Sequence, residues 1–315
     1  MAKTYVVTGG AGFIGSHLTE RLLKQGERVR VVDNLLTGKA ETLDYLRSVG
    51  GDLSIHQTSI TELEALIPIF QGAEVVFHQA ALPSVPRSVD NPLETHLHCV
   101  TGTLNVLEAA RQAGVRRVVY AASSSAYGDS DADYKVETLP TAPISPYGAA
   151  KLAGEIYCQA YTRTYGLETV CLRYFNVFGA RQDPSSQYAA VIPKFITSLL
   201  QGQAPRIFGD GQQSRDFTYI DNVLHGNLLA AEAPQAVGEV MNLATGGRVT
   251  LLELVDKLNH ILGTNIAPLL DAPRQGDILH SRADIQKAAN LLDYSPIVTF
   301  DEGLRRTAAW YQTHA

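Results

Sequence analysis

The chain has 315 residues, enough for one large or two modest domains, and 45% hydrophobic with 18% charged residues excludes a chain that is disordered as a whole. Its 26 Lys and Arg against 32 Asp and Glu give a formal charge of −6, so it has no basic excess for a nucleic-acid backbone. No apolar run approaches the roughly 20 residues that span a bilayer, and the N-terminus enters a strand pattern without a leader. We therefore expect a cytoplasmic protein with neither a nucleic-acid nor a membrane partner.

The metal-binding residue types are scattered along the chain. Cys99, Cys158 and Cys171 are far apart, form no C-x-x-C pair and have no His at ligand spacing. The nine histidines form no H-x-x-x-H or H-E-x-x-H motif. We expect buried thiols, no disulfide framework and no metal site.

Short β-rich runs alternate with longer helical patterns in the first half of the chain, which is typical of parallel strands joined by crossover helices. Apolar residues between the runs return at helical spacing, for example Leu18, Leu22 and Leu23. The sequence therefore predicts an α/β fold with a doubly wound, Rossmann-type parallel sheet. The predicted strands are Tyr5–Val7, Val29–Val32, Leu53–Ile55, Val75–Phe77, Arg117–Tyr120 and Thr169–Leu172.

The rhythm changes after about residue 175, where Gly and Pro become frequent and strand-like pieces such as Arg206–Phe208 and Val240–Leu243 are short. We expect a dinucleotide-binding domain over residues 1–175, with residues 213–245 returning to it. Residues 176–315 would mainly form a smaller mixed α/β substrate lobe, packed closely enough to leave a cleft between the two.

A glycine motif directly follows the first predicted strand and opens an amphipathic helix. Gly9 permits a tight turn, Gly12 lets a pyrophosphate approach the backbone, and Gly15 lets helix and strand pack closely. The helix N-terminus then offers unpaired N–H groups to an anion. A glycine-rich turn that only closes a strand–helix junction is the alternative.

Asp33 ends the second predicted strand, 18 residues beyond Gly15, where a carboxylate can accept hydrogen bonds from an adenosine ribose. The carboxylate would repel a 2′-phosphate and therefore favours NAD. Lys39 nearby leaves NADP open.

Tyr147 and Lys151 stand at i, i+4 on a helix that Ser145-Pro146 would start, so phenol and ammonium share one face. A phenol acts as a base near neutral pH only if a cation stabilises its phenolate, and Lys151 is placed to do so. Upstream, the hydroxyls of Ser123 to Ser125 leave the fifth predicted strand at its carboxyl end, where open α/β sheets bind ligands.

With these motifs the chain resembles the extended short-chain dehydrogenase/reductase family, in its branch of nucleotide-sugar epimerases and dehydratases, over essentially its whole length. The motifs that carry the resemblance are Thr8 to Gly15, Asp33-Asn34, His78 to Ala81, Ser123 to Gly128, Tyr147 to Lys151, Leu172 to Gly179 and Arg215 to Phe217.

The resemblance implies three catalytic residues: Tyr147 as general base, Lys151 holding it and the nicotinamide ribose, and Ser123 bonding the reacting sugar oxygen. A shift by one serine stays open. For NAD it implies contacts with Gly9, Gly12, Phe13, Ile14, Gly15, Asp33, Asn34, Thr37, Gly38, Ser59, Ile60, Gln79, Ala80, Ala81, Cys99, Tyr147, Lys151 and Tyr174. For a UDP-sugar it implies Ser84, Val85, Arg87, Ser124, Ser125, Asn176, Val191, Arg215, Arg274, Asp277 and Ser281.

The chain departs from the family pattern at two cofactor positions: Ser59 stands where Asp is usual, and Cys99 where Asn is common. Dehydratases of this branch carry Asp-Glu just after the position of Ser123, whereas here Ser124 and Ser125 follow, which argues against 4,6-dehydration. The resemblance then implies 4-epimerisation, in which C4 gives its hydride to NAD and receives it back on the other face of a transient 4-keto sugar.

Ser281 corresponds by resemblance to the gate beside the sugar C2 substituent, where relatives restricted to unmodified hexoses carry a bulky aromatic residue. Its small side chain, with Asp277 to Ser281 and Ala81 to Ser88, is most similar to UDP-N-acetylglucosamine 4-epimerases. UDP-glucose 4-epimerase, UDP-glucuronate 4-epimerase or decarboxylase, and a non-catalytic NAD-binding regulatory protein are the alternatives. The resemblance also implies a homodimer through helices near residues 95–113 and 146–165.

Overall fold

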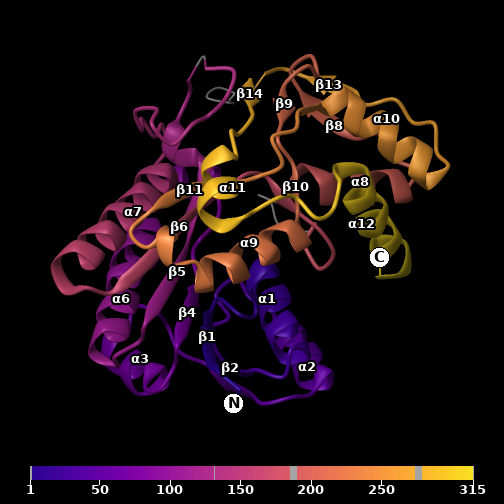
Figure 1. Cartoon of the computed structure of the whole chain (residues 1–315). Helices are drawn as coiled ribbons and strands as arrows, with labels where there is room; N and C mark the ends of the chain where they lie inside the picture. The colour runs from indigo at the N-terminus through magenta and orange to yellow at the C-terminus, as the bar shows by residue number, and fades with distance from the viewer. Residues whose placement is uncertain (1, 131, 185–189, 274–278, 315) are drawn as a thin grey trace.

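A computed structural model describes residues 2–130, 132–184, 190–273 and 279–314. Parallel strands form the central sheet (Figure 1), and the chain order of its strands makes it a doubly wound, Rossmann-type α/β fold as the sequence predicts. In spatial order the strands are β11 (Val240–Leu243), β6 (Glu168–Tyr174), β5 (Arg117–Ser123), β4 (Val75–His78), β1 (Thr4–Thr8), β2 (Arg28–Val32) and β3 (Leu53–His56).

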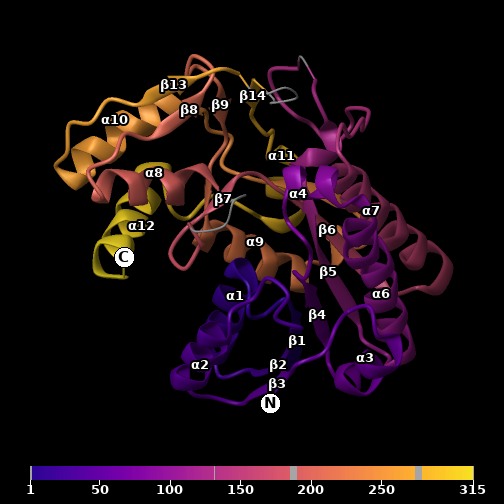
Figure 2. The same ribbon diagram turned by 180° about the vertical axis from the view of Figure 1, so that it is seen from behind.

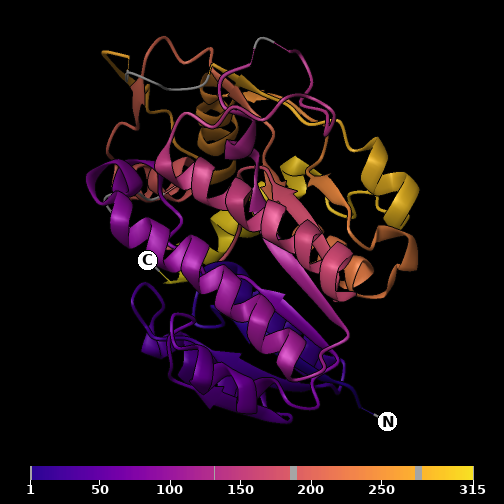
Figure 3. The same ribbon diagram turned by 90° about the vertical axis from the view of Figure 1, so that its left-hand side faces the viewer.

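Helices cover both faces of this sheet because its strands are apolar on both sides. Val7, Phe77 and Leu172 face one cluster of buried side chains, and their neighbours Val6 and Val76 face the other. The first cluster is closed by α1 (Phe13–Lys24), α2 (Ala40–Val49) and α9 (Ile220–Glu232). The second is closed by α3 (Leu63–Phe70), α6 (Gly102–Gln112) and α7 (Pro146–Tyr165), and Figure 3 shows α6 and α7 side by side on the outside of the sheet.

The last sheet strand comes from late in the chain. β11 pairs in parallel with β6, with Val240 opposite Cys171 and Leu243 opposite Tyr174. The preceding helix α9 packs against the same sheet. The chain therefore leaves the sheet after β6, builds part of a second lobe and then returns.

Most of the remaining elements lie beyond the carboxyl ends of the strands (Figure 2), whereas η3 follows the C-terminus of α9 and α11 packs on η3 and β11. Three small sheets join β10 with β7, β12 and β14 with β9, and β13 with β8. Their strands are β7 (Val177–Phe178), β8 (Arg206–Phe208), β9 (Ser214–Arg215), β10 (Thr218–Tyr219), β12 (Val249–Thr250), β13 (Leu269–Asp271) and β14 (His280–Ser281). The helices and turns are α4 (Val85–Asp90), α5 (Pro92–His96), the π-helical turn η1 (Leu97–Thr101), the 3₁₀ turns η2 (Ser124–Tyr127) and η3 (Pro234–Ala236), α8 (Val191–Leu200), α10 (Leu251–Leu262), α11 (Gln286–Leu292) and α12 (Phe300–His314).

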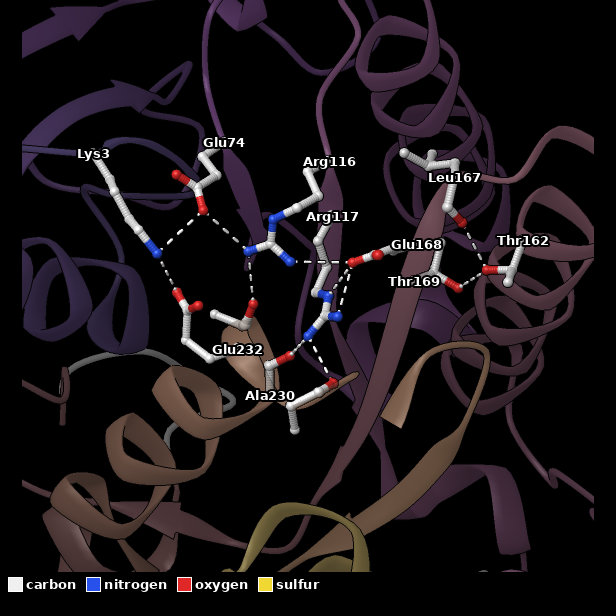
Figure 4. Close-up of polar contacts among 12 residues, drawn as sticks. Lys3, Glu74, Arg116, Arg117, Thr162, Leu167, Glu168, Thr169, Ala230 and Glu232 are labelled. Carbon is white, nitrogen blue, oxygen red and sulfur yellow. Dashed lines mark hydrogen bonds and ion pairs between the residues drawn. The ribbon is translucent and has the colours of Figure 1, made fainter. Parts of the chain in front are cut away.

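At the opposite, amino-terminal edge of the sheet, two arginines fasten the end of α9 to the strands (Figure 4). Arg117 is buried and donates to the carbonyl oxygens of Ala230 at 2.8 Å and Ala233 at 2.9 Å, while also pairing with Glu168 at 2.8 Å. Arg116 adds a bond to the Ala231 carbonyl at 3.0 Å. These cations satisfy carbonyls that a helix leaves open at its C-terminus.

The described residues contain neither a membrane-spanning helix nor a metal-binding cluster. None of their helices combines the length and apolar character needed to cross a bilayer. No group of three or more His, Cys, Asp or Glu in those ranges is arranged to hold a metal ion. Cys99, Cys158 and Cys171 are free and buried.

Candidate active site

The turn between β1 and α1 brings backbone N–H groups to the mouth of the sheet. Gly9 has a φ of +72°, and the Gly12 N–H donates to its carbonyl at 3.1 Å. A Cβ on Gly15 would lie 2.1 Å from the Gly9 carbonyl oxygen, so α1 can approach the turn this closely only with glycine there. The open N–H groups of the first turn of α1 then face the site and suit a phosphate group.

Asp33 anchors this turn at the end of β2. Its carboxylate accepts the Ala11 N–H at 2.9 Å and the Leu35 N–H at 2.8 Å. Burial raises the pKa of Asp33, and these two N–H groups oppose that shift by stabilising the charged form. Lys39, the cation that leaves NADP open, pairs with Asp183 at 3.0 Å.

A cavity of about 460 Å³ runs from the glycine turn to the end of β5 and α7. Many residues expected to bind the cofactor or the substrate line it, and they come from several separate segments. They are Gly9, Gly12, Phe13, Ile14, Gly15, Asp33, Asn34, Thr37, Ile60, Gln79, Ala80, Ala81, Ser84, Arg87, Tyr147, Lys151 and Tyr174. The glycine cradle and the Asp33 carboxylate at one end of this cavity, with Tyr147 and Lys151 also in its wall, fit a dinucleotide.

Other expected site residues lie next to this cavity or in the second lobe rather than in its wall. These are Gly38, Ser59, Val85, Cys99, Ser123, Ser124, Ser125, Asn176, Val191, Arg215 and Ser281. Arg274 and Asp277 fall outside the described residues.

Tyr147 and Lys151 lie in the first turns of α7, which begins after Ser145. The Ser145 hydroxyl caps the helix by accepting the Gly148 N–H at 3.1 Å. A Cβ on Gly148 would lie 2.6 Å from the Ser125 carbonyl oxygen, so the serine turn presses directly against this helix start. That contact brings the end of β5 to the phenol of Tyr147.

The Ser123 hydroxyl lies near enough to the Tyr147 phenol to affect its pKa. Burial raises the pKa of Tyr147 well above its ordinary value of 10.0, the nearby Cys99 adds to the rise, and the Ser123 hydrogen bond opposes it. Of the three serines, Ser123 is the one that affects the pKa of Tyr147, and its catalytic role stays a prediction. Ser124 and Ser125 begin the turn η2, and the Ser125 N–H donates to the Ser123 hydroxyl oxygen at 3.2 Å.

Lys151 is buried beneath the cavity. Its ammonium donates to the Ala121 carbonyl at 2.8 Å and lies 4.9 Å from the centre of the Tyr120 ring. Burial lowers the pKa of Lys151, while Cys99, Cys158 and Glu155 raise it. The ammonium is thus fixed at the carboxyl end of β5, one helical turn from the phenol.

Tyr174 at the end of β6 is held by two amide side chains. Its hydroxyl lies 3.1 Å from the Gln79 amide nitrogen and 2.8 Å from that of Asn227, which is fully buried on α9. Asn227 is a site residue that the sequence analysis does not include. No local sequence pattern predicts a role for Asn227, because the residue that it contacts, Tyr174, lies 53 residues away in the chain.

Ser281 and Arg215 lie opposite each other in the second lobe, because β14 pairs in parallel with β9. The Asp216 N–H donates to the Ser281 carbonyl at 2.8 Å. The buried carboxylate of Asp216 accepts the N–H groups of Thr245 and Gly246 at 3.1 and 2.9 Å, and Asn176 donates to its carbonyl at 3.1 Å. Asp216 therefore holds the loops around the predicted sugar gate together.

The segment after β4 presents Ser84, Val85 and Arg87. Ser84 caps α4 by accepting the Arg87 N–H at 3.1 Å, and the Arg87 guanidinium lies 3.4 Å from the Glu94 carboxylate.

Ser59 and Cys99, the two cofactor positions that depart from the family pattern, have protein partners. Ser59 accepts from the Asn34 amide at 3.4 Å, and the Cys99 sulfur accepts the Leu82 N–H at 3.4 Å.

Residues 181–183 form part of the cavity wall and are not among the site residues expected from the sequence. Arg181 has a φ of +63° and pairs with Glu20 on α1 at 2.7 Å. The Ala180 carbonyl lies 2.8 Å from the His17 ring nitrogen, and Asp183 holds Lys39. A run of polar residues directly after the Leu172–Gly179 motif is the only sequence signal for this wall.

Comparison with known proteins agrees with this geometry. A model of the NAD dependent epimerase/dehydratase family matches residues 5–244. A UDP-glucose 4-epimerase of Mycolicibacterium smegmatis is 38% identical, covering 98% of each chain. The solved UDP-N-acetylglucosamine 4-epimerase of Methanobrevibacter ruminantium M1, in complex with UDP-N-acetylmuramic acid, is 38% identical with a TM-score of 0.95, covering 100% of this chain and 99% of that one. A UDP-glucuronic acid 4-epimerase of Bacillus cereus, solved with UDP-glucuronic acid and NAD, is 31% identical with a TM-score of 0.91, covering 99% and 100%.

Proposed function

The chain belongs to the NAD-dependent epimerase/dehydratase family as a UDP-sugar 4-epimerase that uses NAD, and on this premise we propose that its substrates are UDP-N-acetylglucosamine and UDP-N-acetylgalactosamine. The observation that carries this choice is the small side chain of Ser281 beside Arg215, on the paired strands β14 and β9. A serine there leaves room for an N-acetyl group on C2, while Arg215 supplies a guanidinium suited to a diphosphate.

We propose that Tyr147 is the base and that Ser123 orients the C4 hydroxyl of the sugar against it. The effect of Ser123 on the pKa of Tyr147 supports these roles, as does the place of Ser123 at the carboxyl end of β5. The raised pKa of Tyr147 means that the phenol of the ligand-free protein is protonated at neutral pH. NAD, when bound, supplies a hydride acceptor and a positive charge, and that charge favours loss of the phenol proton.

The roles of the other side chains follow from the same placement. Lys151, whose ammonium is held by Ala121, would bind the nicotinamide ribose hydroxyls and keep a positive charge one turn from the phenolate. The turn at Gly9 and the start of α1 would hold the pyrophosphate, and Asp33 the adenosine ribose. We propose that residues 1–175 together with 213–245 bind NAD. Residues 176–315 would mainly bind the UDP-sugar.

Turnover of three UDP-sugars by the NAD-loaded protein tests the substrate. We expect UDP-N-acetylglucosamine to be converted to its 4-epimer with a higher kcat/KM than UDP-glucose or UDP-glucuronate, followed by proton NMR of the anomeric signals. Faster turnover of either unmodified sugar would reject the proposed preference while leaving the epimerase chemistry intact.

A variant at the gate tests the structural reason. Ser281→Tyr should lower kcat/KM for the N-acetylated substrate about tenfold or more, because a ring would fill the space beside C2, and should largely spare UDP-glucose. Ser281→Ala is the matched control, because it keeps the small volume and should leave the preference unchanged. An equal loss of both activities in Ser281→Tyr would count against a gate at this position.

We further propose that two copies associate through the face formed by α5, η1, α6 and α7 (Figure 3). Large apolar side chains are exposed there: Leu93 at 82%, Ile156 at 59% and Leu97 at 45%. Sedimentation velocity at micromolar concentration should give twice the chain mass, and Leu93→Glu with Ile156→Glu should shift it to a single chain. A monomeric parent protein would reject this interface.

A further inference from the structure

A buried histidine, which the proposed chemistry does not use, directly precedes Gln79 and Ala80, which line the cavity. His78 is the last residue of β4 and is 1% exposed. One ring nitrogen, Nδ1, lies 2.8 Å from the Thr8 hydroxyl at the end of β1. The other, Nε2, lies 3.0 Å from the Thr103 hydroxyl on α6, so both nitrogens have a partner inside the protein.

The partners of Thr103 settle which nitrogen carries the proton. The Thr103 hydroxyl lies 2.8 Å from the Cys99 carbonyl oxygen, which can only accept. Its single proton therefore goes to Cys99, and its contact with His78 must be a hydrogen bond donated by the ring. This places a proton on Nε2.

The other nitrogen is then an acceptor, because burial and the nearby Lys151 lower the pKa of His78 to about 3 and keep the ring neutral. Nδ1 accepts from the Thr8 hydroxyl, whose oxygen in turn accepts the Ala80 N–H at 3.3 Å. Cys99, Thr103, His78, Thr8 and Ala80 thus form a series of hydrogen bonds. Only one set of donor and acceptor roles satisfies every group in this series. The opposite direction would leave the Thr103 and Cys99 oxygens 2.8 Å apart without a proton between them.

One end of the series, Ala80, lies at the glycine turn, and the other end, Cys99, lies near Tyr147 and Lys151. Ala80 packs on the glycine turn, where a Cβ on Gly9 would lie 2.7 Å from the Ala80 nitrogen. Cys99 lies in the π-helical turn η1, packs with Leu82 and Ala150, and acts electrostatically on both Tyr147 and Lys151. A π turn lacks the regular helical ladder, so an added tie at its carbonyl fixes its position.

We propose that His78 is a positioning residue for the epimerase: a neutral imidazole, protonated on Nε2, that ties the dinucleotide turn to the helix turn packed beside Tyr147 and Lys151. The effect of His78 on kcat rests on the proposed function, whereas the protonation state of the His78 ring does not. His78 touches neither substrate nor cofactor in this role and acts through Thr8, Ala80, Thr103 and Cys99.

Nitrogen NMR of the holoenzyme labelled with ¹⁵N-histidine tests the protonation state. We expect His78, assigned by its loss in His78→Gln, to show one protonated and one bare nitrogen, with the proton on Nε2, from pH 6 to 8. A proton on Nδ1, or a charged ring in that range, would overturn the proposal. This measurement on the parent protein needs no other variant to fold.

Thr103→Val removes the acceptor of the Nε2 proton at nearly constant volume. We expect the proton to move to Nδ1, which can donate to Thr8 instead, and kcat to fall about tenfold with KM changed less than about threefold, because the groups beside Tyr147 lose their alignment. Thr103→Ser keeps the hydroxyl and should retain the parent spectrum and kcat. A valine variant with parent kcat would overturn the positioning role. A parent protein that epimerises no UDP-sugar would reject the proposed function, and the NMR result would still decide the direction of the series.

Discussion

The phenol of Tyr147 lies in surroundings that oppose its ionisation until ligands arrive. Burial raises the pKa of this phenol. The Lys151 ammonium donates its hydrogen bond to the Ala121 carbonyl rather than to the phenol. The sequence analysis expects Lys151 to hold Tyr147 directly, and this stays a prediction for the ligand-bound protein. In the proposed mechanism this base is therefore protonated in the empty site, which limits proton transfer to the occupied enzyme.

Tyr147→Phe tests the base. Loss of the hydroxyl should lower kcat about 1,000-fold, within the range that proton transfer contributes, while bound NAD is retained as measured by absorbance after denaturation. Tyr157→Phe, on the same helix but 37% exposed, is the control and should keep parent activity. Substantial turnover by Tyr147→Phe would contradict the assignment.

Elements that depend on local pattern are the ones that the sequence predicts. The strands of the central sheet and the start of α7 at Pro146 follow from short runs of apolar β-forming residues, the glycine turn and the Ser145 cap, all within a few residues. The pairing of β14 with β9 joins Ser281 to Arg215 across 66 residues, and the tie between Asn227 and Tyr174 spans 53. Short-range patterns carry no information on such contacts, so the second lobe and the positioning residues need the structure.

The hydrogen bonds that attach α9 to the sheet lead to a prediction about the free energy of unfolding. Arg117→Met should lower the free energy of unfolding by about 3 kcal/mol, because the buried carbonyls of Ala230 and Ala233 lose their donor and Glu168 loses one of its two cations. Arg47→Met removes an exposed pair with Asp44 and should change it by less than about 0.5 kcal/mol. Urea unfolding followed by far-UV circular dichroism measures both, and equal effects would reject the distinction.

For the whole molecule, one partly buried and one fully buried histidine, both neutral, link stability to pH. Burial lowers the pKa of His17 from 6.5 to about 4, and that of His78 to about 3. Below pH 6.5 the unfolded chain therefore binds protons that the folded chain does not, so stability falls as pH decreases from about 6.5 toward 4.

The variant His17→Gln isolates one of these contributions, since glutamine can still donate to the Ala180 carbonyl. Between pH 6 and 5 the free energy of unfolding of the parent protein should fall more steeply than that of the variant, by up to about 1.4 kcal/mol per pH unit. Urea titrations at several pH values give both slopes. Parallel slopes would show that His17 does not take up its proton on unfolding.

The late return of β11 to the sheet has a consequence for biosynthesis. Until residues 240–243 have left the ribosome, the outer edge of β6 has no hydrogen-bonding neighbour, although six strands of the nucleotide fold are already made. A nascent chain in that state presents an open strand edge to other chains, and a fragment ending at residue 175 would keep it permanently. Any fragment that completes the sheet must therefore include the segment between β6 and β11, and no single cut in the chain separates the dinucleotide-binding sheet from the second lobe.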